Sequence, residues 1–220
     1  MDILRKHEIF EIEVLGKMKS TRMLDVLVFG GGSMLRLCHE LNRYSVDLDF
    51  WFIKKTPYKT YFNRLQKVFD QDYEVTDAEI KYYTLLFEIR SPNYPKRLKI
   101  EIRKEVKDCD FQERIAFSKY STQQVILRTH TLEQTMKNKL EAFLDRGEIR
   151  DCFDIEFLLR RGIPLPVLRP KQLTEFKKKL IRLKEKDFKV KLGSILENDI
   201  RQYYIKYQFK YLQEKIAGNA

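Results

Sequence analysis

The chain has 220 residues, of which 43% are hydrophobic, and a formal net charge of +11 at pH 7. This length and composition are enough to bury a hydrophobic core, in one large domain or two small ones. The chain has no apolar run of about 18 residues and no secretory signal at its start, so no transmembrane helix and no membrane partner are expected. Its three cysteines are widely spaced, which argues against a disulfide framework and a zinc site and favours a cytoplasmic protein.

The positive charge is concentrated towards the end of the chain. Between Val167 and Ala220, 14 Lys and Arg residues stand against 6 Asp and Glu residues. Such an uneven excess indicates a polyanionic partner, either RNA or DNA. The alternative is a solvated helical surface that is merely rich in lysine.

The first half of the chain mixes predicted helices and strands. An amphipathic helix is predicted over the first twenty residues, although Gly16 disfavours it. Pro57 indicates the start of a later helix, because proline is favoured in the first helical turn. This later helix is predicted over 58–70. Between the two helices the sequence predicts a strand over 26–29, a helix over 33–41 and a strand over 47–53.

Strand patterns follow this helix. Strands are predicted over 73–80 and 82–90, and the segment SPNYP (91–95) is a turn. In RLKIEIRKE (97–105) apolar and charged residues alternate strictly, so one face of this third strand is polar. Glu101 lies on that polar face and is flanked by cations.

After about Thr131 the hydrophobic pattern becomes helical. The predicted helices cover 132–144, 151–160, 170–184 and 195–215, and the last two are basic and amphipathic. The chain therefore consists of a half that contains strands and helices and a half that is helical, with the join near residues 115–130.

The most informative stretch is VFGGGSMLRLCHELNRYSVDLDFWF, which covers residues 28–52. Residues i and i+2 of a strand point to the same face, so Asp47 and Asp49 direct two carboxylates to one place. Two like charges inside an otherwise apolar strand are unfavourable unless a cation joins them. Carboxylate ligation favours Mg²⁺ or Mn²⁺ over zinc, and Glu101 can complete the site from a neighbouring strand. The alternative is a pair of solvated aspartates at a strand edge.

Three glycines lie between the first strand and the short helix. They fit neither the P-loop pattern nor the dinucleotide-binding pattern G-x-G-x-x-G. The turn Gly31-Gly32-Ser33 nevertheless begins a helix, whose first backbone N–H groups are available to bind a phosphate. A glycine run alone is compatible with an ordinary turn, and it is the position between strand and helix that favours phosphate contact.

The helical segment KNKLEAFLDRGEIRDCFDIEFLL is a second region rich in charges. Lys139 and Arg146 are expected near Asp151 and Asp154. Considered alone, this pattern is best explained by ordinary charge pairing on exposed helices. The three histidines are scattered through the chain, and none is expected to act as a base.

Three blocks of the sequence together resemble a known family. They are GGSMLRL…RYSVDLDF (31–50), the strand KIEI (99–102) and the helical block EQTMKNKLEAF…RGEIRDCFDI (133–155). In this order they resemble the AbiEii/AbiGii-type nucleotidyltransferases of the DNA polymerase β-like superfamily, whose first signature reads G-G-T-A-L…R-x-S-x-D-[LIV]-D-F. The resemblance implies an α+β fold. A nucleotidyltransferase domain over 1–120, with a mixed β-sheet and flanking helices, would precede a helical domain over 121–220 that completes the active site and carries a basic surface.

The resemblance also implies roles for the first block. Gly31, Gly32 and Ser33 would bind the triphosphate of a nucleotide. Asp47 and Asp49 would be catalytic residues that bind two Mg²⁺ ions.

The other two blocks supply the remaining implied catalytic residues. Glu101 would be the third metal ligand and the base for the attacking hydroxyl. Lys139 would contact the nucleotide phosphates. Asp151 would be the late catalytic acid, with Asp154 as its neighbour.

Two further residues would bind the nucleotide by resemblance, and three positions depart from the family pattern. Arg43 and Ser45 would shape the turn before the aspartate strand. Glu101 stands where Asp is commoner, Ser33 replaces a threonine, and Glu133 stands where the family often has Asp. None of these changes removes a chemical group that the reaction needs.

The implied function is nucleotidyl transfer by a toxin. An NMP would move from an NTP to a hydroxyl acceptor, expected to be RNA such as tRNA, with pyrophosphate released and Mg²⁺ (or Mn²⁺) as cofactor. A cognate antitoxin is an expected partner, because members of the family often act in toxin–antitoxin pairs. Three alternatives stay open: transfer to a small molecule such as an antibiotic, a nucleotide- or RNA-binding module without activity, and a DNA-binding structural protein.

Overall fold

The computed structural model describes residues 2–217 of the chain. The chain forms two compact units. The first contains the residues up to Glu40 together with Tyr44–Thr131, and the second contains Leu41–Arg43 and the residues from Leu132 onwards. Within the described residues, no helix combines the length and the apolar character that crossing a membrane requires.

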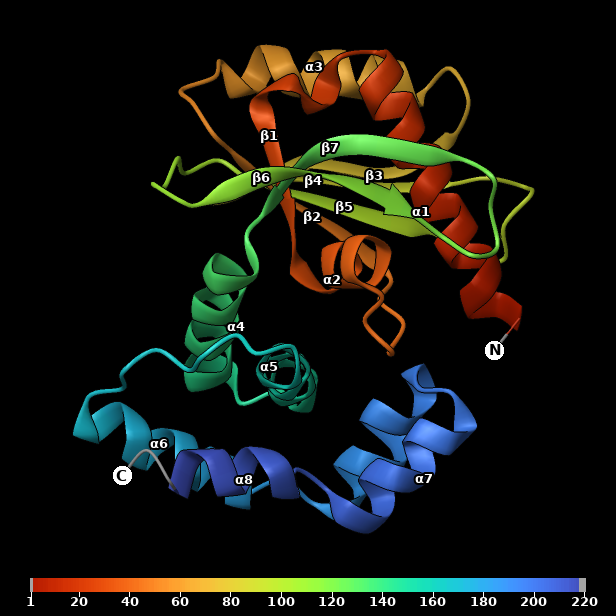
Figure 1. The fold of residues 1–220 in the computed structure, drawn as a ribbon. Helices are drawn as coiled ribbons and strands as arrows, with labels where there is room; N and C mark the ends of the chain where they lie inside the picture. Colours follow the sequence, from red (N-terminus) through yellow and green to blue (C-terminus); the bar gives the residue numbers. More distant parts are fainter. Residues whose placement is uncertain (1, 218–220) are drawn as a thin grey trace. The chain divides into compact units, whose positions relative to one another are not determined.

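The first unit is a seven-stranded sheet with helices packed against it (Figure 1). The helices and strands predicted before residue 106 are confirmed, with ends that differ by one or two residues. In chain order the elements are α1 (Asp2–Ser20), η1 (Met23–Val26), β1 (Leu27–Gly30), α2 (Gly31–His39), β2 (Asp47–Phe52), α3 (Tyr58–Phe69), β3 (Glu74–Ile80), β4 (Thr84–Arg90), β5 (Leu98–Arg103), β6 (Phe111–Phe117) and β7 (Gln124–His130).

β2 lies at the centre of this mixed sheet. The strand order is β3-β4-β5-β2-β1-β7-β6, in which β2 is parallel to β5 and β1 is parallel to β7, while the other neighbours are antiparallel. Leu48 and Phe50 of β2 are buried in the core, whereas Asp47 and Asp49 lie on the opposite, half-buried face. The alternation in the sequence therefore decides which face of the sheet carries the carboxylates.

Buried aromatic rings join α1 and α3 to the sheet. Phe69 of α3 packs edge-on against Phe87 of β4, with 5.5 Å between ring centroids. Phe10 of α1 and Phe69 both contact Tyr73, the residue directly before β3. Burial of such large rings is the main favourable contribution to packing here, and it anchors α1 behind the sheet.

A buried hydrogen-bond chain connects α1, α2 and β2. Ser33 Oγ lies 2.6 Å from the backbone oxygen of Asp47 and 2.8 Å from Glu11 Oε1. A hydroxyl has one proton and a backbone oxygen can only accept, so Ser33 donates to Asp47. The contact with Glu11 then requires a protonated carboxyl that donates to Ser33 Oγ. Burial raises the pKa of Glu11 well above its usual value, which favours this neutral form.

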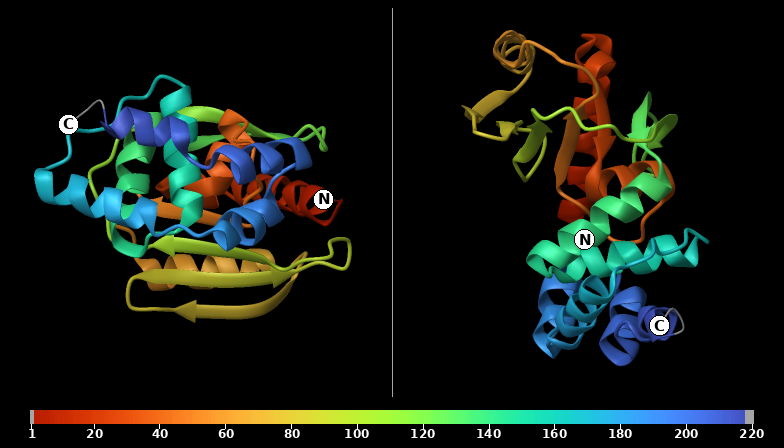
Figure 2. Two further views of the ribbon diagram at one scale, coloured as in Figure 1. Left: turned by 90° about the horizontal axis from the view of Figure 1, so that it is seen from below. Right: turned by 90° about the vertical axis from the view of Figure 1, so that its left-hand side faces the viewer.

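The described elements of the second unit are all helical (Figure 2). Phe143 of the first helix packs against Phe176 of the third, with 4.8 Å between their ring centroids. In chain order the elements are α4 (Leu132–Arg146), α5 (Ile149–Arg160), α6 (Pro170–Ile181), the π-helical turn η2 (Asp187–Leu192), η3 (Gly193–Ile195), α7 (Asn198–Tyr207) and α8 (Lys210–Ala217).

β6 and β7 are not predicted from the sequence, which indicates only a join near residues 115–130. β6 is an edge strand with mostly exposed side chains, so it lacks the apolar alternation of a half-buried strand. β7 lies beyond residue 120 but pairs with β1, and it belongs to the first unit.

The single helix predicted over 195–215 is wrong, because the structure has two helices there. α7 ends at Tyr207 and α8 begins at Lys210. Gln208 between them has a φ of 50°, a value that is uncommon outside glycine and that breaks the helix. No glycine or proline marks this break, so the hydrophobic pattern runs through it.

We expect Glu11→Gln to stabilise the protein at neutral pH. Because the folded-state pKa of Glu11 is raised, the unfolded chain loses this proton first once the pH exceeds the ordinary value of 4.5. The free energy of unfolding of the wild type then falls by at most about 1.4 kcal/mol per pH unit. Glutamine has no such proton to lose, and its amide can still donate to Ser33.

Thermal melts at a series of pH values check this expectation. The difference in Tm between Glu11→Gln and the wild type should widen as the pH rises above 4.5. Glu113→Gln, on the exposed face of β6, is the matched control and should show no such trend. A constant difference for Glu11→Gln would contradict a neutral Glu11.

Candidate active site

The turn between β1 and α2 brings the backbone of Gly31 against the carboxylate of Asp49. Gly31 has a φ of +73°, in the left-handed region that favours glycine. A Cβ atom added there would lie 2.3 Å from Asp49 Oδ2, which is closer than any real contact. Position 31 therefore requires glycine for two independent reasons, and the first turn of α2 begins directly beside a carboxylate of β2.

Three carboxylates share one face of the sheet. Asp47 and Asp49 are two residues apart on β2 and therefore point to the same face. Glu101 of the parallel strand β5 is in register with Asp49. Residues in register on neighbouring strands point to the same face. The structure thus places the three residues expected to bind metal on the face opposite the buried Leu48.

Lys99 belongs to the same group, although the sequence interpretation did not assign it a role. It is in register with Asp47, and its ammonium forms an ion pair with Glu101. This hydrogen-bonded pair, aided by the charges of Asp47 and Asp49, raises the pKa of Lys99 despite its partial burial. The strict alternation of K-I-E is the signal that could have identified it, because it places the lysine on the carboxylate face.

The carboxylates are not gathered into a ready-made metal cluster. Across residues 2–217, no three His, Cys, Asp or Glu side chains lie close enough together to hold an ion. The fully assembled three-carboxylate site expected from the sequence is therefore absent from the described residues. Carboxylates repel one another when no cation joins them, and Glu101 is instead paired with Lys99.

The chemistry of these residues nevertheless fits a hard divalent cation. Asp47, Asp49 and Glu101 offer only carboxylate oxygens, which Mg²⁺ and Mn²⁺ prefer. Mg²⁺ usually keeps several waters and needs only one or two carboxylates. The absence of a side chain at Gly31 lets the Asp49 carboxylate approach the backbone at the start of α2.

The two serines expected at the nucleotide differ in their surroundings. Ser33 is fully buried, and its hydroxyl is engaged with Glu11 and the Asp47 carbonyl. In this structure its side chain supports β2 from behind, so only the backbone N–H of Ser33 remains for the phosphate contact expected at the start of α2. Ser45 is half-buried in the segment that leads into β2.

The remaining expected site residues form a buried charge cluster in the second unit. Arg43 donates two hydrogen bonds of 2.7 Å to Asp154, from Nε to Oδ1 and from Nη2 to Oδ2. The Lys139 ammonium lies 2.7 Å from Asp154 Oδ2 and 3.5 Å from Asp151 Oδ1. Arg146 binds Asp151 through two hydrogen bonds of 2.8 and 2.9 Å.

Burial distinguishes this cluster from the surface charge pairing that the segment alone favoured. Asp151 and Asp154 are fully buried, and Arg43 and Lys139 nearly so. Burial by itself would raise the pKa of Asp154, but Arg43 and Lys139 outweigh it and hold this pKa below its usual value. Asp154 is therefore ionised, and Arg43 is the counter-ion of a buried carboxylate rather than an exposed group ready for a nucleotide.

His130, His7 and Cys38 are buried and lack the properties of a catalytic base or nucleophile. His130 packs against Trp51 with 4.8 Å between ring centroids, and burial lowers its pKa to about 4. His7 lies 3.0 Å from the backbone oxygen of Val46, and burial also lowers its pKa. Burial raises the pKa of the Cys38 thiol to about 12.

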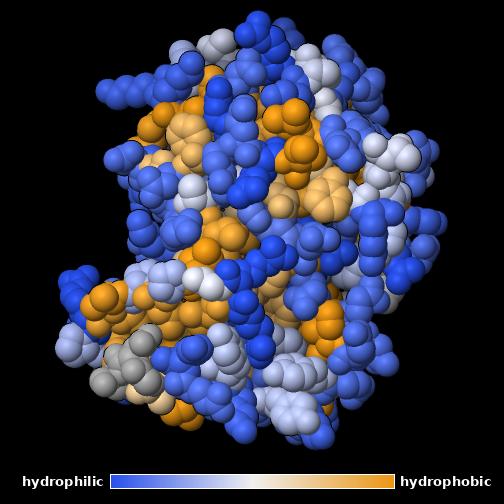
Figure 3. All heavy atoms as spheres, in the orientation of Figure 1, coloured by the Kyte–Doolittle hydropathy of each residue, from blue (hydrophilic) through white to orange (hydrophobic). Residues whose placement is uncertain are grey.

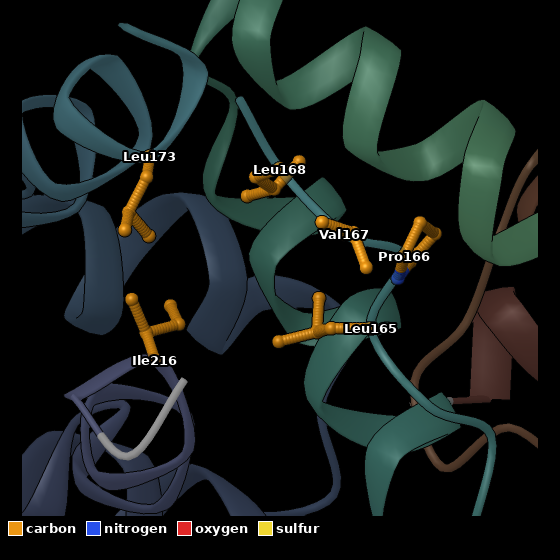
Figure 4. Close-up of a pocket in the computed structure, with 6 residues that line it drawn as sticks. All are labelled: Leu165, Pro166, Val167, Leu168, Leu173 and Ile216. Carbon is orange, nitrogen blue, oxygen red and sulfur yellow. The ribbon is translucent and has the colours of Figure 1, made fainter. Parts of the chain in front are cut away.

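An apolar hollow in the second unit contributes no chemistry. It has a volume of about 240 Å³ and lies among the connection before α6, α6 itself and α8 (Figure 4). Hydrophobic residues are also visible over this part of the second unit in Figure 3. None of its lining side chains can donate, accept or transfer a proton; they are Leu165, Pro166, Val167, Leu168, Leu173 and Ile216.

Two solved structures show that the fold is shared with other proteins. JHP933 from Helicobacter pylori is 20% identical, with a TM-score of 0.56 over 95% of this chain and 93% of that chain. MenT4, a nucleotidyltransferase toxin from Mycobacterium tuberculosis, is 14% identical, with a TM-score of 0.51 over 96% of this chain and 94% of that chain. No curated protein matches the sequence.

A family profile matches almost the whole chain. It is described as the nucleotidyl transferase AbiEii toxin of type IV toxin–antitoxin systems, and it covers residues 21–212. The match includes the glycine turn, both aspartates of β2, Glu101 and the buried charge cluster. The chain belongs to the AbiEii nucleotidyltransferase toxin family and is a nucleotidyltransferase.

Proposed function

We propose that this nucleotidyltransferase transfers an NMP from an NTP to a hydroxyl group of RNA, with Mg²⁺ as cofactor, and that tRNA is its acceptor. The observation that carries the proposal is the alignment of Gly31, Asp49 and Glu101. The start of a helix, which favours phosphate, lies beside a carboxylate face, which favours a divalent cation. Catalysis of phosphoryl chemistry needs this combination, because it depends on positioning and charge stabilisation.

The proposed nucleotide site uses residues of the first unit, which we propose is the nucleotidyltransferase domain. Backbone N–H groups of Gly31, Gly32 and Ser33 would bind the triphosphate at the start of α2. Asp47, Asp49 and Glu101 would hold the metal, which when bound would neutralise phosphate charge and align the reacting groups.

The proposed reaction is an in-line displacement at phosphorus. The acceptor hydroxyl forms a bond to the α-phosphate while the bond to the β-phosphate oxygen breaks, so that pyrophosphate leaves. The Glu101 carboxylate is the proposed acceptor of the hydroxyl proton. Lys99 is placed beside it, where its positive charge can stabilise charge that develops on the phosphates.

The proposed role of the second unit is to supply cations for the nucleotide and the acceptor. Lys139 is the proposed contact for nucleotide phosphates, and Asp154 and Asp151 position it within the buried cluster. The excess of Lys and Arg after Val167 fits an RNA backbone, because each phosphate contact releases counterions. As a toxin the protein would have a cognate antitoxin as its partner.

The test is transfer of label to total tRNA from each of the four NTPs, radiolabelled at the α-phosphate, in the presence of Mg²⁺. The wild type should label tRNA with at least one NTP, and the double variant Asp47→Asn/Asp49→Asn should not. EDTA should abolish the signal and added Mn²⁺ should restore it. Labelling by the wild type alone would also identify the nucleotide.

Two other results would contradict the proposal. The absence of labelling with every NTP would exclude tRNA as acceptor and favour transfer to a small molecule. Equal labelling by the wild type and the double variant would show that the β2 carboxylates are not the active site.

We expect Lys99→Gln to increase the stabilisation that Mg²⁺ confers. In the wild type an entering cation competes with the Lys99 ammonium for Glu101. Removal of that ammonium leaves more negative charge on the face, so Mg²⁺ should raise Tm by roughly 1–2 °C more than in the wild type. Lys107→Gln, at an exposed lysine, is the control. Equal Mg²⁺ shifts in all three proteins would argue against metal binding at this face.

We expect Asp154→Asn to lower the free energy of unfolding by about 3–5 kcal/mol, because it leaves Arg43 and Lys139 buried without their shared carboxylate.

Lys139→Met should instead reduce nucleotide transfer beyond its effect on stability. Chemical denaturation and single-turnover labelling separate the two effects. Lys137→Met, exposed on the same helix, is the matched control. Unchanged transfer by folded Lys139→Met would remove Lys139 from the nucleotide site.

A further inference from the structure

A second hollow of the second unit is lined by aromatic and charged side chains. It has a volume of about 300 Å³ and lies where α7 turns into α8, next to the end of α5. Its lining residues are Arg160, Tyr203, Tyr207, Lys210, Tyr211 and Glu214. The hollow thus combines three aromatic rings, two cations and one carboxylate.

The local backbone explains how these rings come together. Tyr203 and Tyr207 are four residues apart on α7, so they lie on the same side of the helix. Their ring centroids are 5.1 Å apart and the ring planes are inclined by 46°. The break at Gln208, with its φ of 50°, then starts α8 so that Tyr211 lines the same hollow.

Part of this arrangement serves the core. Glu156 is fully buried, and it accepts hydrogen bonds from Arg160, from the hydroxyl of Tyr204 and from the backbone N–H of Leu212. Arg160 also donates to the hydroxyl of Tyr203. These partners satisfy the hydrogen-bonding capacity of the Glu156 carboxylate. Tyr207 is not one of them, so the burial of Glu156 does not explain the exposed ring of Tyr207.

Tyr207 presents an apolar ring to solvent beside positive charge. It is 45% exposed and Tyr203 is 41% exposed. The Lys206 ammonium lies 4.9 Å from the centre of the Tyr207 ring, and Lys210 is exposed at the start of α8. Aromatic rings with adjacent cations match the two parts of a single-stranded nucleic acid, because bases stack on rings and phosphates pair with lysine.

We propose that this hollow binds a single-stranded segment of RNA, with a base stacked on Tyr207 and a phosphate at Lys210. The inference rests on the proposed function for the choice of RNA as the nucleic acid. Stacking needs no particular base, so the site would bind many sequences and would favour single strands over duplexes, whose bases are already stacked. Lys210 would contribute affinity that falls as salt is raised.

The experiment measures fluorescence anisotropy of a labelled single-stranded RNA of about 12 nucleotides and of its duplex, titrated with the full-length protein. Tyr207→Ala should weaken single-strand binding about 5- to 100-fold, as loss of one stacked base predicts. Tyr207→Phe keeps the ring and should bind like the wild type. Tyr82→Ala removes a tyrosine that is 82% exposed in the first unit and should have no effect.

Lys210→Gln tests the phosphate contact separately. It should weaken binding and reduce the slope of log affinity against log salt by about one, whereas Tyr207→Ala should leave that slope unchanged. Circular dichroism of each variant checks that the overall helix content is unchanged.

Three outcomes would overturn the proposal. They are no RNA binding by the wild type, equal single-strand binding by Tyr207→Ala and the wild type, and equal losses for Tyr207→Ala and Tyr82→Ala. A failure here is distinct from a failure of the proposed function. Label transfer that depends on Asp47 and Asp49 would survive it, and would show that the RNA is bound elsewhere.

Discussion

The register of β2 in the sheet is the constraint on which the candidate active site depends. β2 is antiparallel to β1 with Gly30 opposite Asp49, and parallel to β5 with Glu101 opposite Asp49. The same register therefore brings Asp49 to the start of α2 and to the polar face of β5. A slip of one residue would turn both aspartates into the core and expose Leu48, so hydrophobic burial and site geometry enforce one another.

Two buried acidic residues, Glu11 and Asp154, are accommodated by opposite means. In the first unit Glu11 is neutral, since it must donate to Ser33 while burial raises its pKa. In the second unit Asp154 is ionised, since Arg43 and Lys139 offset the cost of removing it from water. The neutral acid supports the backbone of Asp47, and the ionised one holds Lys139 in place. Both carboxyls are buried where an uncompensated charge would be unfavourable.

β5 and β6 contrast a strand that the sequence predicted with one that it did not. Strands such as β5 alternate between core and solvent, so their period of two is readable. The edge strand β6 has little buried surface and left no such signal. The break at Gln208 involves a positive φ without glycine, so no residue type marked it in the sequence. The buried hydrogen bond of the Ser33 hydroxyl could not be predicted either, because its partner Glu11 lies on a helix distant in sequence.

The sequence by itself indicated the family and the side of β2 that carries Asp47 and Asp49, because these follow from motif spacing and local periodicity. Tertiary structure decided which groups meet. It buried Arg43 against Asp154 and brought Ser33 against Glu11. The physical reason is that charge pairing and burial depend on distances between segments far apart in the chain, which no local pattern encodes.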